Sequence, residues 1–183
     1  MNCLFIMKLW FVLNGCVLME MIETPLTRML YAKEIEHSVL VHKKPAFSCE
    51  EVSRERNIAA EDILKCILIT DKAMNHSLFC IPGNAALDLK LARKFLCSSR
   101  LSFATREEVE LVTGCRIGTL NPFFHNLNIT VIFDRSIVSK GIVDVSSGSP
   151  NAGVQLQAQI LLLLANPKLG DVIARIEKGK VDA

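Results

Sequence analysis

Short segments of alternating type constrain the fold of this chain more than any other feature of its sequence. From Thr24 onward, apolar β-rich runs alternate with short helical segments, and turn residues separate them. The alternation lacks the regular strand–helix period that a doubly wound parallel sheet requires. We therefore predict an α+β fold, with one domain built around a mixed β-sheet.

Local signals place the individual elements. A Thr-Pro pair and two capping boxes, in which Ser or Thr precedes Glu by three residues, mark helix starts. The predicted helices cover residues 24–36, 48–56, 87–96 and 105–112. The predicted strands cover residues 38–42, 63–70, 78–81, 129–133 and 141–145. Residues 146–153 are predicted as a loop, and residues 155–164 and 167–176 as an edge strand and helices.

Charge and cysteine content exclude several classes of protein. The net charge of +2 is lower than in modules that bind nucleic acid by charge alone, so any RNA contact should be local. Seven cysteines and four histidines show no Cys-x-x-Cys or His-x-x-x-His spacing. We therefore expect reduced thiols, a cytoplasmic location, no structural metal and no cofactor. We expect neither DNA nor a membrane as a partner.

The N-terminal segment differs from the rest of the chain. It is apolar, but Lys8 interrupts it, no small-residue cleavage pattern follows, and it is short for a membrane span. We interpret residues 1–23 as an apolar extension of doubtful status and residues 24–183 as the domain. A membrane-attached protein that uses residues 1–21 is the alternative.

One lysine and two glycine-containing loops are the candidates for a functional site. Familiar enzyme motifs are absent, and no cysteine–histidine pair has the local context of a nucleophile. Lys65 lies within the apolar run ILKCILIT, where its ammonium must either reach water or meet an anion. Glycines in residues 113–124 and 146–153 would let the backbone approach a ligand closely. Each feature alone also fits an exposed lysine or a simple turn.

The order of these motifs resembles the YbaK/EbsC family of aminoacyl-tRNA deacylases, which is related to the editing domain of bacterial prolyl-tRNA synthetase. The resemblance implies a mixed sheet or a partly open barrel flanked by short helices. It extends over about residues 38–164. The stretches that carry it are residues 63–68, 81–84, 87–90, 113–115, 118–122 and 147–153.

The resemblance implies a trans-editing hydrolase that deacylates mischarged tRNA, carrying a small amino acid such as cysteine or alanine on tRNA-Pro or a similar tRNA. Water would attack the 3′-aminoacyl ester, and no metal is required. Lys65 would hold a phosphate or the terminal adenosine, and backbone N–H groups around Gly118 would stabilise the oxyanion. These two residues are the catalytic candidates. The substrate-binding candidates are Ser48, Pro82, Gly83, Thr119, Leu120, Asn121, Pro122, Gly148 and Gly153.

Some positions depart from the family's pattern. Asn84 replaces an aspartate, Cys115 an aromatic residue and Ile117 the first glycine of a frequent pair, and residues 149–152 lack a basic residue. The alternative function is therefore a catalytically silent relative that binds a tRNA 3′ end or an aminoacyl-nucleotide ligand. The capping role of Ser48 would also explain that residue without any substrate contact.

The implied partner is aminoacylated tRNA, with an aminoacyl-tRNA synthetase as a further candidate. Basic side chains could form a path for the acceptor stem, although a solvated basic surface explains each of them equally well. They are Lys43, Lys44, Lys90, Arg93, Lys94 and Arg116.

Overall fold

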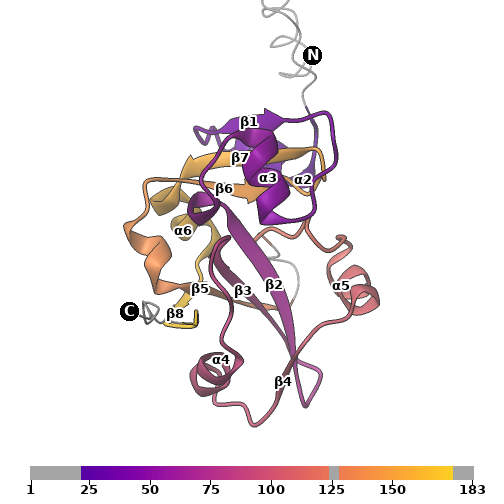
Figure 1. Ribbon diagram of the computed structural model, residues 1–183, viewed down its shortest axis with the longest axis vertical. Helices are drawn as coiled ribbons and strands as arrows, with labels where there is room; N and C mark the ends of the chain where they lie inside the picture. The colour runs from indigo at the N-terminus through magenta and orange to yellow at the C-terminus, as the bar shows by residue number, and fades with distance from the viewer. Residues whose placement is uncertain (1–21, 124–127, 175–183) are drawn as a thin grey trace, which may run out of the picture.

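Two β-sheets organise the structure (Figure 1). The computed structural model describes residues 22–123 and 128–174. The larger sheet consists, in spatial order, of β4 (Leu101–Phe103), β2 (Leu64–Asp71), β3 (His76–Pro82), β5 (Thr130–Asp134) and β8 (Lys168–Gly170). The smaller sheet consists of β1 (Ser38–Val41), β7 (Ala152–Gln157) and β6 (Ile142–Ser146).

The sheets confirm the predicted α+β class. In the larger sheet β2 pairs antiparallel with β3 and β4, whereas β5 pairs parallel with both β3 and β8. All pairs in the smaller sheet are antiparallel. Neither sheet closes on itself among the described strands, so the mixed sheet, rather than a closed barrel, is the observed form.

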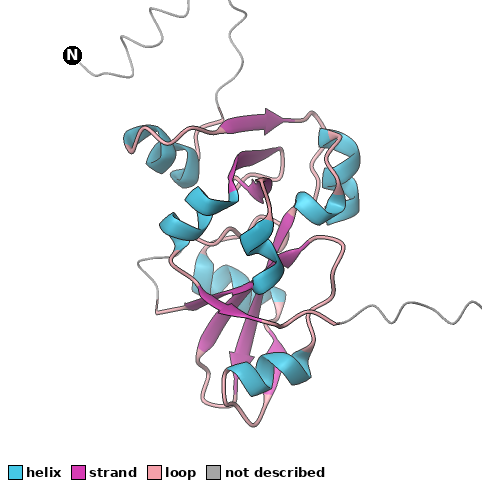
Figure 2. Ribbon diagram, turned by 90° about the vertical axis from the view of Figure 1, so that its left-hand side faces the viewer, coloured by secondary structure: helices cyan, strands magenta, loops and turns pink. Residues whose placement is uncertain are grey.

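Short helices surround the sheets (Figure 2). They are α2 (Pro25–Ala32), α3 (Cys49–Arg56), α4 (Leu89–Phe95), α5 (Arg106–Thr113) and α6 (Ala158–Ala165), with 3₁₀ turns η1 (Ala60–Asp62) and η2 (Arg135–Ser139). Both predicted Ser/Thr–Glu capping boxes are present, and Thr24 caps α2 in a box with Thr27. These local contacts set where three of the helices begin.

The observed elements depart from the predicted ones at four places along the chain. Strand β7 begins inside the predicted loop 146–153, and residues 168–170 form a strand within the segment 167–176. Helix α2 ends at Ala32, earlier than predicted, and β4 has no counterpart among the predicted strands. Strand β4 has only three residues and no clear alternation, so its pairing with β2 rather than its sequence defines it.

The larger sheet is buried on both faces because its central strands carry apolar residues at successive positions. Leu68 and Leu78 belong to a core shared with the smaller sheet, α2 and α6. Ile69 and Phe79 point into a second cluster, which α4 covers through Ala92. Adjacent strand residues face opposite sides of a sheet, so one uninterrupted apolar run supplies both cores.

Candidate active site

A cleft lies where the two sheets meet, between α3 and two loops. It encloses about 500 Å³, including the part that is open to solvent. An isolated parallel bridge between Ile63 and Asp144 joins the sheets at this point. The cleft is lined by residues 46–49, 52 and 56 in and before α3, by 63–66 around the start of β2, by 118 and 120 after α5, and by 144, 146 and 149 in and after β6.

Lys65 carries the positive charge of the cleft from β2. Its side chain is half-buried, and Nζ donates to the Gly83 carbonyl at 3.0 Å. No residue in the described ranges forms an ion pair with Lys65. An ammonium has three donors, so two remain for an anion or another acceptor in the cleft.

Pro82 and Gly83 lie behind Lys65 rather than on the cleft surface. Pro82 pairs with Leu64, and the Gly83 N–H donates to the Ile63 carbonyl at 2.7 Å. A Cβ at Gly83 would lie 2.5 Å from the Ala60 carbonyl oxygen. These contacts fix the Gly83 backbone, and the fixed Gly83 carbonyl orients the Lys65 ammonium that donates to it.

Gly118 brings the loop after α5 against the segment before α3. Its φ is +86°, and a Cβ there would lie 2.7 Å from the Phe47 carbonyl oxygen and 3.0 Å from the Phe47 Cα. Only glycine allows this approach of two backbones. No acceptor for the Gly118 N–H is found among the described residues, so this donor remains available at the cleft.

The residues that follow Gly118 make the loop rigid. The Thr119 N–H and Oγ1 both donate to the Arg116 carbonyl, at 3.0 and 2.9 Å. The Asn121 Oδ1 accepts the Phe123 N–H at 3.1 Å. Thr119, Asn121 and Pro122 are buried, whereas Leu120 both packs in the core and lines the cleft.

Ser48 and Cys49 present the start of α3 to the cleft. The Ser48 Oγ accepts the Glu51 N–H at 3.2 Å, which confirms its capping role. A Cβ at Gly83 would lie 3.0 Å from the Cys49 Sγ, so this thiol lies beside the end of the β2–β3 hairpin that carries Lys65. Burial raises the pKa of the Cys49 thiol, and the nearby Lys65 charge opposes the change.

The two predicted glycines of the last loop have different positions. Gly148 has a φ of +97°, and the nearest atom to a Cβ there would be the Asn121 Nδ2, at 3.9 Å. The two glycine-containing loops are thus adjacent. Gly153 lies in β7, where a Cβ would be 1.9 Å from the Arg56 Nη1 and 2.8 Å from the Asp144 Oδ1. Gly153 therefore leaves room for two side chains that are not among the site residues predicted from the sequence.

Arg56 and Asp144 form a buried ion pair in the cleft lining. The Arg56 Nη1 donates to the Asp144 Oδ1, and their side chains are 4% and 0% exposed. The Arg56 Nη2 lies 3.3 Å from the His42 Nε2, and the His42 Nδ1 lies 2.5 Å from the Lys44 carbonyl oxygen. A guanidinium only donates, so Nε2 accepts and Nδ1 carries the proton.

This pair has an energetic cost. The Arg56 Nε and Asp144 Oδ2 are buried without a hydrogen-bond partner among the described residues. Burial raises the pKa of the Asp144 carboxyl to about 6, although the adjacent Arg56 charge opposes the change. The sequence held one signal for it, because a carboxylate within the apolar run IVDV must find a partner.

Comparison with known proteins shows the family of the segment that forms the cleft. The family model of the aminoacyl-tRNA editing domain matches residues 43–162. The chain belongs to this family. All the residues that line the cleft of this editing domain lie within the matched segment. Helix α2 and strand β1 precede it, although β1 pairs with β7 inside it.

Relatives of the editing domain agree with the predicted resemblance to the YbaK/EbsC family. The prolyl-tRNA editing protein ProX of Acetoanaerobium sticklandii is 24% identical over 127 residues, which cover 67% of this chain and 77% of ProX. A crystal structure described as a candidate trans-editing enzyme for prolyl-tRNA synthetase has a TM-score of 0.72 at 23% identity, over 84% of this chain and 99% of that one. A hypothetical protein of known structure has a TM-score of 0.75 at 22% identity, over 81% of this chain and 98% of its own. The resemblance is confirmed, and the two structures show the shared fold.

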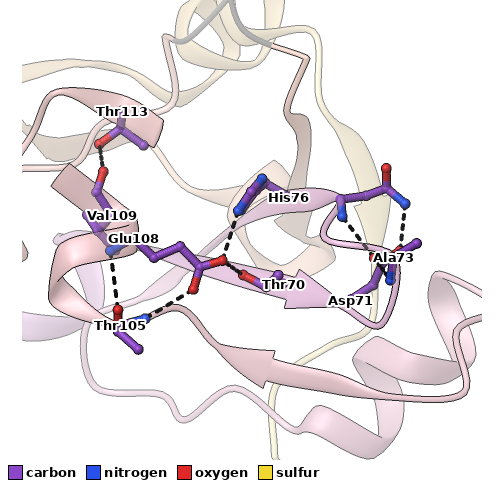
Figure 3. Close-up of polar contacts among 9 residues, drawn as sticks. Thr70, Asp71, Ala73, His76, Thr105, Glu108, Val109 and Thr113 are labelled. Atoms are coloured by element: carbon purple, nitrogen blue, oxygen red, sulfur yellow. Dashed lines mark hydrogen bonds and ion pairs between the residues drawn. The ribbon is translucent and has the colours of Figure 1, made fainter. Parts of the chain in front are cut away.

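A second polar cluster of the editing domain lies at the far end of the β2–β3 hairpin (Figure 3). The Glu108 Oε1 accepts the Thr70 hydroxyl at 2.5 Å and lies 2.9 Å from the His76 Nε2. Its Oε2 accepts the Thr105 N–H at 3.3 Å. The Thr70 hydrogen bond is the main cause that lowers the pKa of Glu108. Glu108 thus fastens α5 to the hairpin.

Two further observations concern the described part of the editing domain. No group of three or more His, Cys, Asp or Glu side chains there is arranged to hold a metal ion. No helix within the described ranges has the length and apolar character to cross a bilayer. The N-terminal extension, residues 1–23, lies almost wholly outside the described residues.

Proposed function

We propose that this chain is a trans-editing deacylase that hydrolyses the ester between a wrongly attached amino acid and the 3′ end of tRNA. The observation that carries the proposal is Lys65, whose half-buried ammonium has no carboxylate partner among the described residues at the cleft of an aminoacyl-tRNA editing domain. A cation placed in this way suits a phosphate of the tRNA end.

Hydrolysis needs little more than position in such a site. Lys65 holds the terminal nucleotide, and a water attacks the ester carbonyl, whose oxygen becomes negative. The Gly118 N–H stabilises this oxyanion, since a fixed donor is worth most where charge develops. The products are the free amino acid and the tRNA hydroxyl, and no metal takes part. Chelation with EDTA should therefore leave the rate unchanged.

The cleft lining supports a small amino acid as the substrate. Ala46, Val52, Ile63 and Leu120 supply apolar surface, and the Gly118–Phe47 backbone contact fixes one side. A methylene changes binding by only about 1–3 kcal/mol, so exclusion of larger residues requires rigid backbone. We propose cysteine or alanine on tRNA-Pro or a similar tRNA, and the choice of tRNA is consistent with the name of the relative ProX, a prolyl-tRNA editing protein.

The test is a deacylation panel with Cys-, Ala- and Ser-charged tRNA. Lys65→Ala should lower kcat/KM by about 100-fold, which is the scale of a lost positioning contact. Its thermal midpoint should stay close to that of the wild type, because Lys65 makes one hydrogen bond. Lys72→Ala, an exposed change in the turn between β2 and β3, is the control. Spontaneous rates with every tRNA would refute the proposal, and tight binding without turnover would select the catalytically silent alternative.

A further inference from the structure

Helix α3 is attached to the rest of the molecule by little apolar surface. Its sequence is CEEVSRER, and Val52 is its one buried residue. Val52 packs in a small cluster with Ala46 and Ile63, and the half-buried Cys49 of α3 packs against that cluster. Because a helix with one buried apolar side chain is weakly fixed by packing, a directional contact must set its position.

The Arg56–Asp144 pair supplies that contact. Arg56 is the last residue of α3, and its guanidinium reaches Asp144 in β6 and His42 after β1. Gly153 in β7 leaves the space that the guanidinium occupies. The Arg56 side chain of α3 is therefore bonded to β6 and to the residue after β1, and it lies against Gly153 of β7.

The opposite, N-terminal end of α3 and the residues just before it line the same cleft. Phe47, Ser48 and Cys49 line it, with Gly118 packed on the Phe47 backbone and Cys49 beside Gly83 and Lys65. A shift of α3 would therefore move these residues relative to Lys65 and Gly118.

A buried ion pair with two unpartnered polar atoms adds little to stability, and an apolar pair of similar size is often as stable or more so. What the charged pair can add is a defined geometry. We propose that Arg56 and Asp144 are positioning residues for deacylation, which hold α3 so that Phe47–Cys49 meet Lys65 and Gly118 at the productive distance. The inference rests on the proposed function for its effect on turnover.

The double variant Arg56→Met/Asp144→Leu separates position from stability. We expect a thermal midpoint no lower than that of the wild type, together with a fall in kcat/KM of at least tenfold, mainly in kcat. Misplacement by about 1 Å can cost that much. The pair Arg56→Gln/Asp144→Asn, which restores a directional hydrogen bond, should recover part of the rate. Asp62→Leu/Lys140→Met removes a more exposed ion pair outside the cleft lining and is the matched control.

Alkylation of Cys49 by iodoacetamide reports the position of α3 without any tRNA. The thiol is half-buried beside Gly83, so a displaced α3 should expose it and speed its labelling by at least fivefold. Cys97, an exposed thiol, should react equally in all variants. Peptide mass analysis resolves the two sites.

The outcomes are distinct. Faster Cys49 labelling with reduced turnover at an unchanged midpoint supports the inference. Unchanged labelling overturns it whatever the turnover, and faster labelling with full turnover overturns it as well. If the wild type deacylates no charged tRNA, the proposed function fails, and the Cys49 rates alone then decide whether the pair positions α3.

Discussion

Gly118 shows how one residue can serve the site through its backbone. Its left-handed φ of +86° and its contact with the Phe47 backbone are separate demands, since a Cβ would be opposed by both. Gly114 in the same loop has a φ of +69°, but a Cβ there would meet no atom within 4 Å. Both glycines have a positive φ, but Gly118 alone of the two makes the close approach and lines the cleft.

Replacing each glycine by alanine isolates that approach. Both variants should lose about 1–2 kcal/mol of stability from the positive φ. Gly118→Ala should also lower kcat/KM by about tenfold or more, because Phe47 or the loop must move, whereas Gly114→Ala should keep its rate. Parallel denaturation and deacylation measurements check this, and equal rates for the two variants would contradict it.

Asp144 should make stability depend on pH. Burial raises its folded pKa to about 6, from an ordinary value of 3.8. Between these values the folded state binds more protons than the unfolded state, so stability falls as pH rises through this window. The charged and titratable groups that face Asp144 are Arg56 and Cys49, with His42 beyond Arg56.

Asp144→Asn removes this titration. From about pH 4 to 7 the wild type should lose on the order of 3 kcal/mol of unfolding free energy relative to the variant. Denaturant titrations of both proteins at several pH values measure the difference. A difference that grows in favour of the wild type as pH rises would show that the ion pair outweighs the burial.

At the scale of elements, the local signals were sufficient for the starts of α2, α3 and α5 and insufficient for strand pairing. The caps at Ser48 and Thr105 form within a single turn, so four residues of sequence contain all the information. The start of β7 is predicted as a loop because Pro150 and Gly153 are typical of turns, although Gly153 is there to admit Arg56.

In the candidate site, too, local features could be predicted from the sequence and long-range contacts could not. Lys65, Ser48, Gly118 and Leu120 were predicted and line the cleft. Arg56 and Asp144 lie 88 positions apart, and no local pattern relates them. Only the packing of α3 against β6 brings them together, so a single sequence could signal the need for a partner at Asp144 but not its identity.

Glu108 is partly buried, and its carboxylate connects α5 to two strands of the larger sheet. It completes the capping box of α5 and accepts hydrogen bonds that tie α5 to β2 and β3 (Figure 3). Glu108→Ala should cost about 2–3 kcal/mol, the sum of a lost cap and two lost hydrogen bonds. Glu107→Ala, also in the first turn but outside this cluster, should cost about 0.5 kcal/mol or less.

Chemical denaturation measures both variants. Because the pKa of Glu108 is lowered in the folded state, its contribution should be present at neutral pH and lost as pH falls below its ordinary value of 4.5. Equal losses of unfolding free energy for Glu107→Ala and Glu108→Ala would contradict the role of Glu108 in linking α5 to the β2–β3 hairpin.

At the scale of the whole molecule, the basic residues predicted as a path for tRNA fall into two separate groups. Helix α4, which carries Lys90, Arg93 and Lys94, lies at the end of the long axis opposite α3 and the cleft (Figure 1). Lys43 and Lys44 precede α3, and Arg116 precedes Gly118. All three are exposed, and they are the candidates near the cleft.

Charge reversal distinguishes the two groups. Lys43→Glu/Lys44→Glu should weaken binding of charged tRNA by about tenfold at low salt and reduce the salt dependence, since fewer phosphates are neutralised. Lys90→Glu/Lys94→Glu, with the same change of charge, should alter affinity by less than about twofold. Filter-binding at several salt concentrations measures both, and a larger effect from α4 would place the tRNA on the opposite end.

The pairing of β1 with β7 has a consequence for biosynthesis. Ser38–Val41 leaves the ribosome early, yet its partner Ala152–Gln157 is translated near the end. Until then the Arg56 guanidinium of α3 is not packed against β7, because Gly153 has not yet been translated. Distant pairing of this kind delays folding. The editing cleft is therefore completed only after β7 has been translated, and a fragment that ends before Ala152 should lack the strand that packs against the Arg56–Asp144 pair.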